Sequence, residues 1–124
     1  MAKKRIIVID DSPLILAMAA DALEEAGHQV FATDSGIEAN QFIYSCEQRP
    51  DLILIDVMMP MLNGDRKVRL LKDRISSRDI PVLLMSSKSE PELEELTRSS
   101  GADGFISKPF DKQTLLQKID RLLS

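Results

Sequence analysis

Residues 51–60 contain the feature that most restricts how this chain can fold: an aliphatic run that ends in a carboxylate. Leu52–Ile55 is continuously aliphatic and leads directly into Asp56. A short continuous apolar run is typical of a strand buried on both faces, as in a parallel sheet covered by helices. Pro60 and Asn63-Gly64 then predict a loop. Because open α/β sheets bind ligands beyond the carboxyl ends of their strands, Asp56 is a candidate functional residue, although a solvated loop aspartate is the plain alternative.

The same alternation of apolar run and helical stripe recurs along the chain. Apolar runs predict five strands, at residues 6–9, 30–32, 52–56, 81–86 and 105–107. Apolar residues at helical spacing predict a helix after each strand, with these inward positions: Ile15, Met18, Ala22 and Ala26; Ala39, Phe42, Ile43 and Cys46; Val68, Leu71 and Ile75; Leu93 and Leu96; Leu115, Ile119 and Leu122.

This rhythm predicts βαβ units with right-handed crossovers, and therefore a parallel sheet with helices on both faces. Alternation alone does not fix the order of the strands. We expect a flavodoxin-like, doubly wound, five-stranded sheet in the order 2-1-3-4-5, which is the economical arrangement. The length of 124 residues fits one domain, spanning residues 1–124.

Local signals place several helix ends. Ser12 is suited to cap the first helix and Pro13 to its first turn, while Gly27 is suited to follow its last turn. Ser89 begins a capping-box pattern at the fourth helix. His28 lies in a turn, where we expect it to be solvated, and we assign it no role.

Composition excludes several classes of protein. The formal net charge is −4, with both signs spread along the chain, so a nucleic-acid partner is not expected. The single Cys46 excludes an internal disulfide, which fits a reducing compartment. The basic start at residues 3–5 is followed by only four apolar residues, too few for a leader peptide or a membrane span. We therefore expect a cytoplasmic protein that does not bind a membrane.

Polar residues collect where the predicted strands end. Because parallel strands all end on one side of the sheet, this edge gathers three carboxylates, hydroxyls and one ammonium, from Asp10, Asp11, Asp56, Ser86 with Ser87, and Lys108. Three carboxylates and one ammonium sum to a net charge of −2, which calls for a cation. Oxygen ligands without histidine or cysteine select Mg²⁺, with Mn²⁺ as the other possibility.

Two polar residues at this edge are not needed to bind a metal ion. Lys108 and Ser86 suit a group of oxygens that arrives later, such as a phosphoryl group beside Asp56. Phosphoryl transfer is catalysed mainly by positioning and by neutralising charge. Lys108 would neutralise negative charge on the phosphoryl group, and Ser86 would donate a hydrogen bond to it. Asp56 would be the nucleophile that forms an acyl phosphate.

An ordered set of motifs resembles the receiver domain of two-component response regulators, of the single-domain, chemotaxis-regulator type. The resemblance covers essentially the whole chain and depends on Ile9-Asp10-Asp11-Ser12, Asp56 with Met59-Pro60 and Asn63-Gly64, Ser86, and Lys108-Pro109. It implies that Asp56 accepts a phosphoryl group from a sensor histidine kinase or a histidine phosphotransfer protein. It also implies that Asp10, Asp11, Asp56 and the backbone carbonyl of Met58 hold Mg²⁺, and that Lys108, before a typically cis proline bond, pairs with the phosphate.

The resemblance further assigns a switch. Ser86 and Phe105 correspond to the pair in which a hydroxyl moves toward the phosphate and an aromatic ring turns inward, although Thr and Tyr are commoner at these two positions. Met58 and Lys88 occupy the positions that tune access of the hydrolytic water. Neither carries an acid or amide that could orient water, so we predict a moderately long-lived phosphorylated form.

The predicted fourth helix is the candidate for carrying the signal outward. Its apolar anchor is small, and Glu90, Glu92, Glu94 and Glu95 make it acidic. Weakly packed elements are the ones that move in switches, although an ordinary solvated helix face is the alternative. A downstream protein would then bind the fourth helix, fifth strand and fifth helix. The chain ends with the fifth helix, so we expect a stand-alone receiver or a piece of a longer protein.

Three other functions would also use parts of this pattern. A Mg²⁺-dependent phosphohydrolase of the haloacid dehalogenase type also uses a strand-end aspartate, but it needs a second acid where this chain has Met58. A pseudo-receiver, acting only by interaction, usually lacks one of the acids or the lysine, and all are present here. A nucleotide-binding flavodoxin-like domain is disfavoured because no Gly-rich loop follows the first strand.

Overall fold

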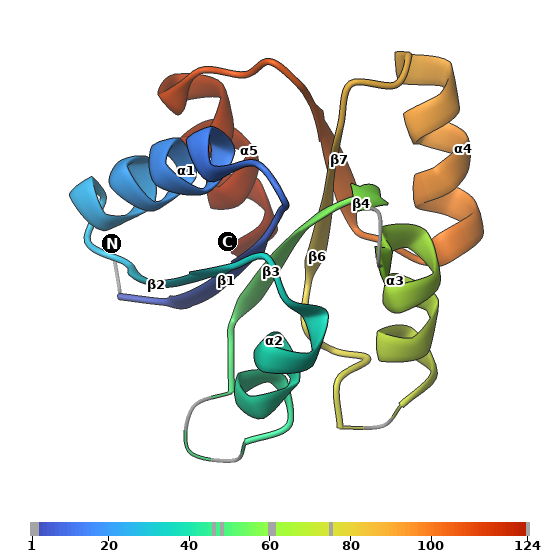
Figure 1. Cartoon of the computed structure of the whole chain (residues 1–124), viewed down its shortest axis with the longest axis horizontal. Helices are drawn as coiled ribbons and strands as arrows, with labels where there is room; N and C mark the ends of the chain where they lie inside the picture. The colour runs from blue at the N-terminus through green and yellow to red at the C-terminus, as the bar shows by residue number, and fades with distance from the viewer. Residues whose placement is uncertain (1–2, 46, 48, 60–61, 75, 124) are drawn as a thin grey trace.

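Strands and helices alternate along the chain, with one additional antiparallel pair of short strands after the third strand (Figure 1). The computed structural model describes residues 3–45, 47, 49–59, 62–74 and 76–123. The strands are β1 (Arg5–Ile9), β2 (Gln29–Thr33), β3 (Leu52–Asp56), β4 (Met58–Met59), β5 (Leu62–Asn63), β6 (Val82–Ser86) and β7 (Gly104–Ser107). The helices are α1 (Pro13–Glu25), α2 (Gly36–Ile43), α3 (Gly64–Asp73), α4 (Glu90–Ser100) and α5 (Lys112–Leu123).

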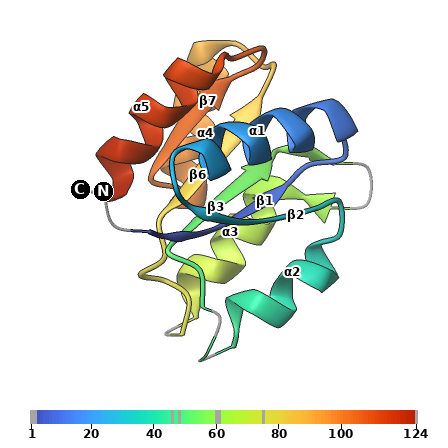
Figure 2. The same ribbon diagram turned by 90° about the vertical axis from the view of Figure 1, so that its left-hand side faces the viewer.

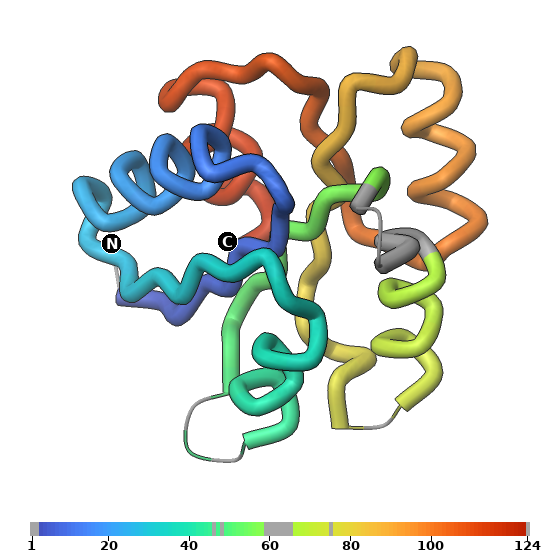
Figure 3. The backbone as a smooth tube through the Cα atoms, in the orientation of Figure 1, coloured from blue at the N-terminus to red at the C-terminus, as the bar shows by residue number. Residues whose placement is uncertain are grey.

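The main sheet has five parallel strands in the order β2-β1-β3-β6-β7. Counting only these main strands along the chain, the order is 2-1-3-4-5, so the predicted fold class is confirmed. The register pairs Ile9 with Ile55, and Asp56 with Met85. The backbone tube shows α1 to α4 carrying the chain back over the sheet to begin the next parallel strand, while α5 follows the last strand (Figure 3).

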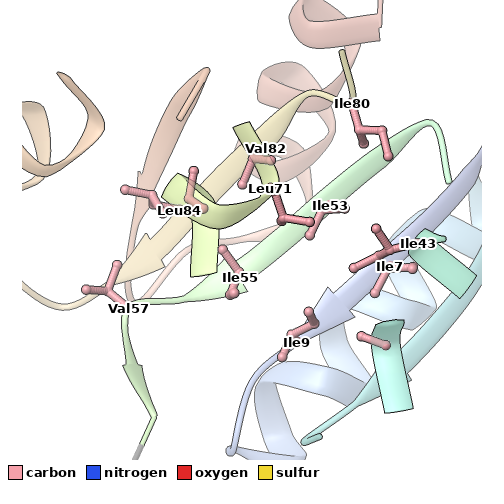
Figure 4. Packing of buried hydrophobic residues seen from close by; sticks show 12 residues of the cluster. Ile7, Ile9, Ile43, Ile53, Ile55, Val57, Leu71, Ile80, Val82 and Leu84 are labelled. Atoms are coloured by element: carbon pink, nitrogen blue, oxygen red, sulfur yellow. The ribbon is translucent and has the colours of Figure 1, made fainter. Parts of the chain in front are cut away.

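Helices cover both faces of this sheet. Figure 2 shows α1 and α5 on one side, with α2 and α3 on the other. Each side has its own apolar core. One core contains Ala39 and Ile43 of α2 with Val68 and Leu71 of α3, packed on residues of the central strands (Figure 4). The other core contains Ala19, Ala22 and Leu23 of α1 with Leu115 and Ile119 of α5.

The central strand β3 explains why its sequence has no polar alternation. Successive side chains of a strand point to opposite faces. Ile53 and Ile55 accordingly enter the core beneath α2 and α3, while Leu52 and Leu54 enter the core beneath α1 and α5. All five residues of β3 are buried. Covering by helices on both faces therefore requires apolar residues at every position until the strand reaches Asp56.

The helix-end signals acted as predicted. The Ser12 hydroxyl accepts a hydrogen bond from the Ile15 N–H at 3.3 Å. Gly27, which follows the end of α1, has a φ of 95°. The Ser89 hydroxyl accepts from the Glu92 N–H at 3.4 Å at the start of α4. Capping by these side chains satisfies N–H groups that have no partner inside the helix.

One expectation was partly right and two were wrong. Of the inward residues predicted for α1, Ala22 is buried, whereas Ile15, Met18 and Ala26 are half-buried; the other buried residues of this helix are Ala19 and Leu23. His28 is buried rather than solvated: it is 5% exposed, and its Nδ1 accepts a hydrogen bond from the Lys4 N–H at 3.2 Å. Residues 58–63 include the short antiparallel pair β4–β5, where a plain loop was expected.

The other predicted inward residues fall as follows. The buried ones are Ala39, Ile43, Val68, Leu71, Leu93, Leu115 and Ile119. The half-buried ones are Phe42, Leu96 and Leu122. Cys46 and Ile75 lie outside the described residues. Among the helices that the structure describes, none combines the length and apolar character needed to cross a bilayer.

We predict that truncating β3 lowers the stability of the whole domain. Leu54 is fully buried, so Leu54→Ala leaves a cavity and should lower the free energy of unfolding by about 3 kcal/mol. Leu14 is 77% exposed, and the matched change Leu14→Ala should alter it by less than about 0.5 kcal/mol. Urea denaturation followed by circular dichroism measures both. Equal losses in the two variants would contradict the two-sided burial of β3.

Candidate functional site

The strand ends bring the predicted polar residues together at the carboxyl edge of the sheet. Asp10 follows β1 directly, Asp56 ends β3, Ser86 ends β6 and Lys108 follows β7. Ligand oxygens of Asp10, Asp11 and Asp56 all lie within 4.8 Å of one another. The Lys108 Nζ lies 2.7 Å from Asp10 Oδ2 and 3.5 Å from Asp56 Oδ1. The fold therefore assembles one acidic cluster with a lysine inserted into it.

Asp56 sits where its negative charge is disfavoured. It is only 3% exposed, and this burial is the main reason that its pKa is raised above the usual value. The neighbouring Asp10 carboxylate raises the pKa further. Two interactions act in the opposite direction: the Met58 N–H donates to Asp56 Oδ1 at 3.1 Å, and the Lys108 ammonium attracts the carboxylate. A cation beside this cluster would relieve the remaining repulsion.

Asp10 has one oxygen that suits a further ligand. Its Oδ1 accepts a hydrogen bond from the Ser12 N–H at 2.9 Å. Its Oδ2 is buried and ion-paired with Lys108, but the pair lacks hydrogen-bond geometry, and no described residue supplies a hydrogen bond to this oxygen. With exposed Asp11 and buried Asp56 beside it, this oxygen faces an all-carboxylate ligand set. Such a set fits a small hard divalent cation, so these residues could hold Mg²⁺ or Mn²⁺.

Ser86 ends β6, one residue beyond Met85, which pairs with Asp56 in the sheet. It is 1% exposed, and its Oγ accepts a hydrogen bond from the Lys88 N–H at 3.1 Å. Its carbonyl accepts from the Lys108 N–H at 2.8 Å, which ties the end of β6 to the segment after β7. The Lys108-Pro109 peptide bond is cis, as the resemblance implied.

The proposed partner of Ser86 in the switch lies further back along β7. In the register, Ser86 pairs with Ser107, so Phe105 is two residues nearer the start of β7 and pairs with Leu84. Phe105 is half-buried against the core beneath α2 and α3. The Lys118 Nζ lies 5.2 Å from the centre of its ring. Ser86 is therefore tied to Lys108 at the end of β6, whereas Phe105 lies further back along β7.

Met58 directs its backbone rather than its side chain toward the cluster. Its N–H holds Asp56, while the residue as a whole is 60% exposed. Sequence reasoning missed the two backbone donors, the N–H groups of Ser12 and Met58, that hold Asp10 and Asp56. Every residue except proline carries a backbone N–H, so no side-chain pattern marks these donors.

Comparison with known proteins identifies the family. The model of the response regulator receiver domain matches residues 6–120. The chain belongs to this family. It is 32% identical over 120 residues to protein PilH of Pseudomonas aeruginosa, covering 97% of this chain and 98% of that protein. It is 31% identical to the polar-differentiation response regulator DivK of Brucella anthropi, covering 97% of this chain and 96% of that protein.

Solved structures agree with this assignment. The chemotaxis response regulator CheY4 of Vibrio cholerae superposes with a TM-score of 0.89 at 30% identity, covering 98% of this chain and 100% of that one. Receiver domains are signalling modules of bacterial two-component systems rather than conventional enzymes, and phosphorylation and Mg²⁺ binding are typical of them. The family therefore favours the signalling reading over the phosphohydrolase and nucleotide-binding alternatives.

We predict that Asp56→Asn stabilises the metal-free receiver domain at neutral pH. Because the folded state raises the Asp56 pKa from 3.8, it favours the protonated carboxyl, and ionisation costs stability. This cost begins as pH rises through 3.8 and is complete above the folded-state pKa. The amide removes the cost, and about 1 kcal/mol would raise Tm by roughly 3–6 °C.

Thermal unfolding in a chelator, at neutral pH and below the ordinary carboxyl pKa, measures this effect. The advantage of the variant should shrink toward zero at the acidic pH, where both states of the wild type are protonated. Asp79→Asn, at an exposed position before β6, is the matched control and should leave Tm unchanged. A lower Tm for Asp56→Asn at neutral pH would contradict the raised pKa.

Proposed function

We propose that this receiver domain accepts a phosphoryl group on Asp56 from the phosphohistidine of a sensor histidine kinase or a histidine phosphotransfer protein. The proposal is supported most directly by one observation: the nearly buried Asp56 carboxylate lies beside two further carboxylates and the Lys108 ammonium. In the reaction, an Asp56 oxygen forms a bond to phosphorus while the bond from phosphorus to the histidine nitrogen breaks. The imidazole keeps the electron pair of the broken bond. We place the exchange in the cytoplasm.

Four groups would hold the divalent cation, Mg²⁺ or alternatively Mn²⁺. They are the carboxylates of Asp10, Asp11 and Asp56 and the backbone carbonyl of Met58. When bound, the cation neutralises charge on the phosphoryl oxygens. The buried Asp10 Oδ2 supports this ligand set, because it is ion-paired with Lys108 but accepts no hydrogen bond from a described residue, which leaves room for a further cation to stabilise it.

Lys108 and Ser86 would respond to the phosphoryl group. The Lys108 ammonium is paired with Asp10 at 2.7 Å, and its second neighbour is Asp56 at 3.5 Å, so a short displacement would bring it to a phosphoryl oxygen. The Ser86 Oγ accepts a backbone hydrogen bond, which leaves its proton available to donate. If Ser86 moves toward the phosphate, Phe105 turns into the space behind it, and this pair forms the switch.

The helix α4 would carry the change to a downstream protein. Leu93 is its only fully buried apolar residue among those that the structure describes, with Leu96 half-buried. A helix with so few apolar contacts shifts at low free-energy cost. The switch residue Phe105 lies on β7, which contacts α4. The face formed by α4, β7 and α5 is therefore the proposed binding surface for the unidentified partner.

We predict that intact mass shows the phosphoryl acceptor directly. With a small acyl phosphate donor and Mg²⁺, the wild-type chain should gain one phosphoryl group, and the gain should disappear in a chelator. Asp56→Asn should abolish it because the amide is not a nucleophile. Asp79→Asn, which makes the same chemical change at an exposed position before β6, should leave it intact.

Two results would decide against the proposal. No gain in any condition would make this chain a pseudo-receiver that acts only by interaction. Equal gain in wild type and Asp56→Asn would place the modification elsewhere, and peptide mapping would then locate it. Steady turnover of a phosphate ester substrate would instead revive the phosphohydrolase reading.

We further predict that the phosphorylated form persists for minutes or longer without a phosphatase. The Met58 side chain cannot orient water, and the Lys88 Nζ lies 3.8 Å from Glu92, directed along α4. General-base assistance to water typically contributes about 10²–10⁴ in rate, so its absence slows hydrolysis. Decay of the phosphorylated mass after removal of the donor measures the half-life, and a half-life of seconds would refute this prediction.

A further inference from the structure

Basic residues are concentrated on and just after α3, although the chain as a whole is acidic. The formal net charge is −4, with 16 lysines and arginines in total. Six of these 16 lie within residues 66–78, where Asp73 is the one acidic residue: Arg66, Lys67, Arg69, Lys72, Arg74 and Arg78. Lys72 has a carboxylate partner, since its Nζ lies 2.8 Å from Asp103. Two of the others, Lys67 and Arg74, contact uncharged side chains instead.

Lys67 and Arg74 reach from the α3 segment to α2, and both meet uncharged partners there. The Lys67 Nζ donates to the Asn40 amide oxygen. The Arg74 guanidinium lies over the ring of Tyr44, 5.0 Å from its centre. Arg49, in the segment after α2, donates from Nε and Nη2 to the Ser76 carbonyl at 3.4 and 3.3 Å. Among the described residues, no carboxylate forms an ion pair with any of these three cations.

The positive charge of Arg74 disfavours the charged form of Lys67. Lys67 is half-buried, and burial is the main cause of its lowered pKa, with the positive charge of Arg74 as the second cause. Elsewhere the chain compensates its lysines, as where Lys112 lies 3.2 Å from Glu25 and Lys108 lies 2.7 Å from Asp10. The two cations contact Asn40 and Tyr44, which lie one helical turn apart and are joined by a backbone hydrogen bond of 3.1 Å. An anion that binds between two such neighbouring cations relieves their repulsion.

We propose that Lys67 and Arg74, with Asn40 and Tyr44 around them, form a binding site for a phosphate dianion between α2 and α3. Lys67 and Arg74 together carry two positive charges, which match the two negative charges of a dianion. A single carboxylate would neutralise only one of these two cations. The guanidinium offers paired donors that fit phosphate oxygens. Asn40 accepts from Lys67 through its oxygen, which leaves its amide hydrogens available to donate.

This site is separate from the acidic edge of the sheet. Its side chains come from helices α2 and α3 and the segment after α3, whereas the cluster around Asp56 is built from strand ends. The acidic cluster repels a free anion, so phosphate binding in a chelator reports on the basic site. The inference therefore does not depend on phosphorylation of Asp56. The ligand is a phosphate group, either free or carried by a small ester.

Phosphate titration of the wild-type chain tests the proposal, at constant ionic strength in a chelator. We expect saturable shifts of the backbone amide resonances of Asn40, Tyr44, Lys67 and Arg74. Lys67→Met keeps the length of the side chain but removes its charge, and it should weaken binding about tenfold or more. Lys67→Arg should restore much of the affinity. Lys112→Met removes an exposed, paired lysine on α5 and should bind like the wild type.

A second variant and a second readout keep the test decisive. If Lys67→Met unfolds, Arg74→Gln removes the other cation at an exposed position and should weaken binding similarly. The pKa of the Lys67 ammonium, followed by NMR, should rise on phosphate binding because an anion favours the charged form. Glycerol phosphate in place of phosphate distinguishes the two sources: tighter binding indicates an ester ligand, and equal binding indicates free phosphate. Shifts that do not saturate, that centre on Lys108, or that persist in Lys67→Met would overturn the proposal.

Discussion

The arrangement depends on a repulsion that the fold creates and only partly relieves. Asp10 and Asp56 stand at the ends of neighbouring strands, both almost fully buried, with Lys108 ion-paired to each. One ammonium cannot neutralise three carboxylates, and the raised pKa of Asp56 reflects the burial and the remaining charge. Two backbone N–H groups hold the carboxylates in position without neutralising them. The two carboxylates are therefore held in place while their charge stays incompletely neutralised, which suits the cation and the phosphoryl group that we propose for this site.

The two apolar cores, one on each face of the sheet, provide the stability that offsets the cost of this site. β3 alternates its side chains between two apolar cores, so Asp56 is fixed by packing on both faces of the sheet. The same construction leaves α4 with a single fully buried apolar residue among those described. Stability is thus uneven: the strands that carry the carboxylates are held firmly, while the helix proposed to move is held weakly. A rigid site with a weakly held neighbour is the combination that a two-state switch needs.

Much of this could be read from the sequence, because strand ends are marked by a change from apolar to polar residues. The run Leu52–Ile55 predicted β3, and the strand-end residues predicted the acidic edge before any coordinates. Contacts between segments were harder to predict. His28 was expected in solvent because turns are usually polar, yet its ring accepts a hydrogen bond from Lys4, a residue distant in sequence. The α1 stripe was only partly predicted: Ala22 is buried as expected, but Ala19 and Leu23 were missed. This helix carries apolar side chains on more than one face, and packing against α5 and the sheet selects among them.

Charge counting indicates how large the switching effect can be. Three carboxylates and Lys108 carry −2, and a divalent cation brings the site to zero. Phosphorylation replaces one carboxylate charge by about −2, so the net charge falls by only about one unit. In the mechanism that we propose, the change is then mainly one of position, since the new phosphoryl oxygens would attract Lys108 and Ser86. A ligand shifts an equilibrium only by the difference in its binding to the two states. A few new hydrogen bonds provide a modest difference, and a modest difference is sufficient only because α4 is weakly anchored.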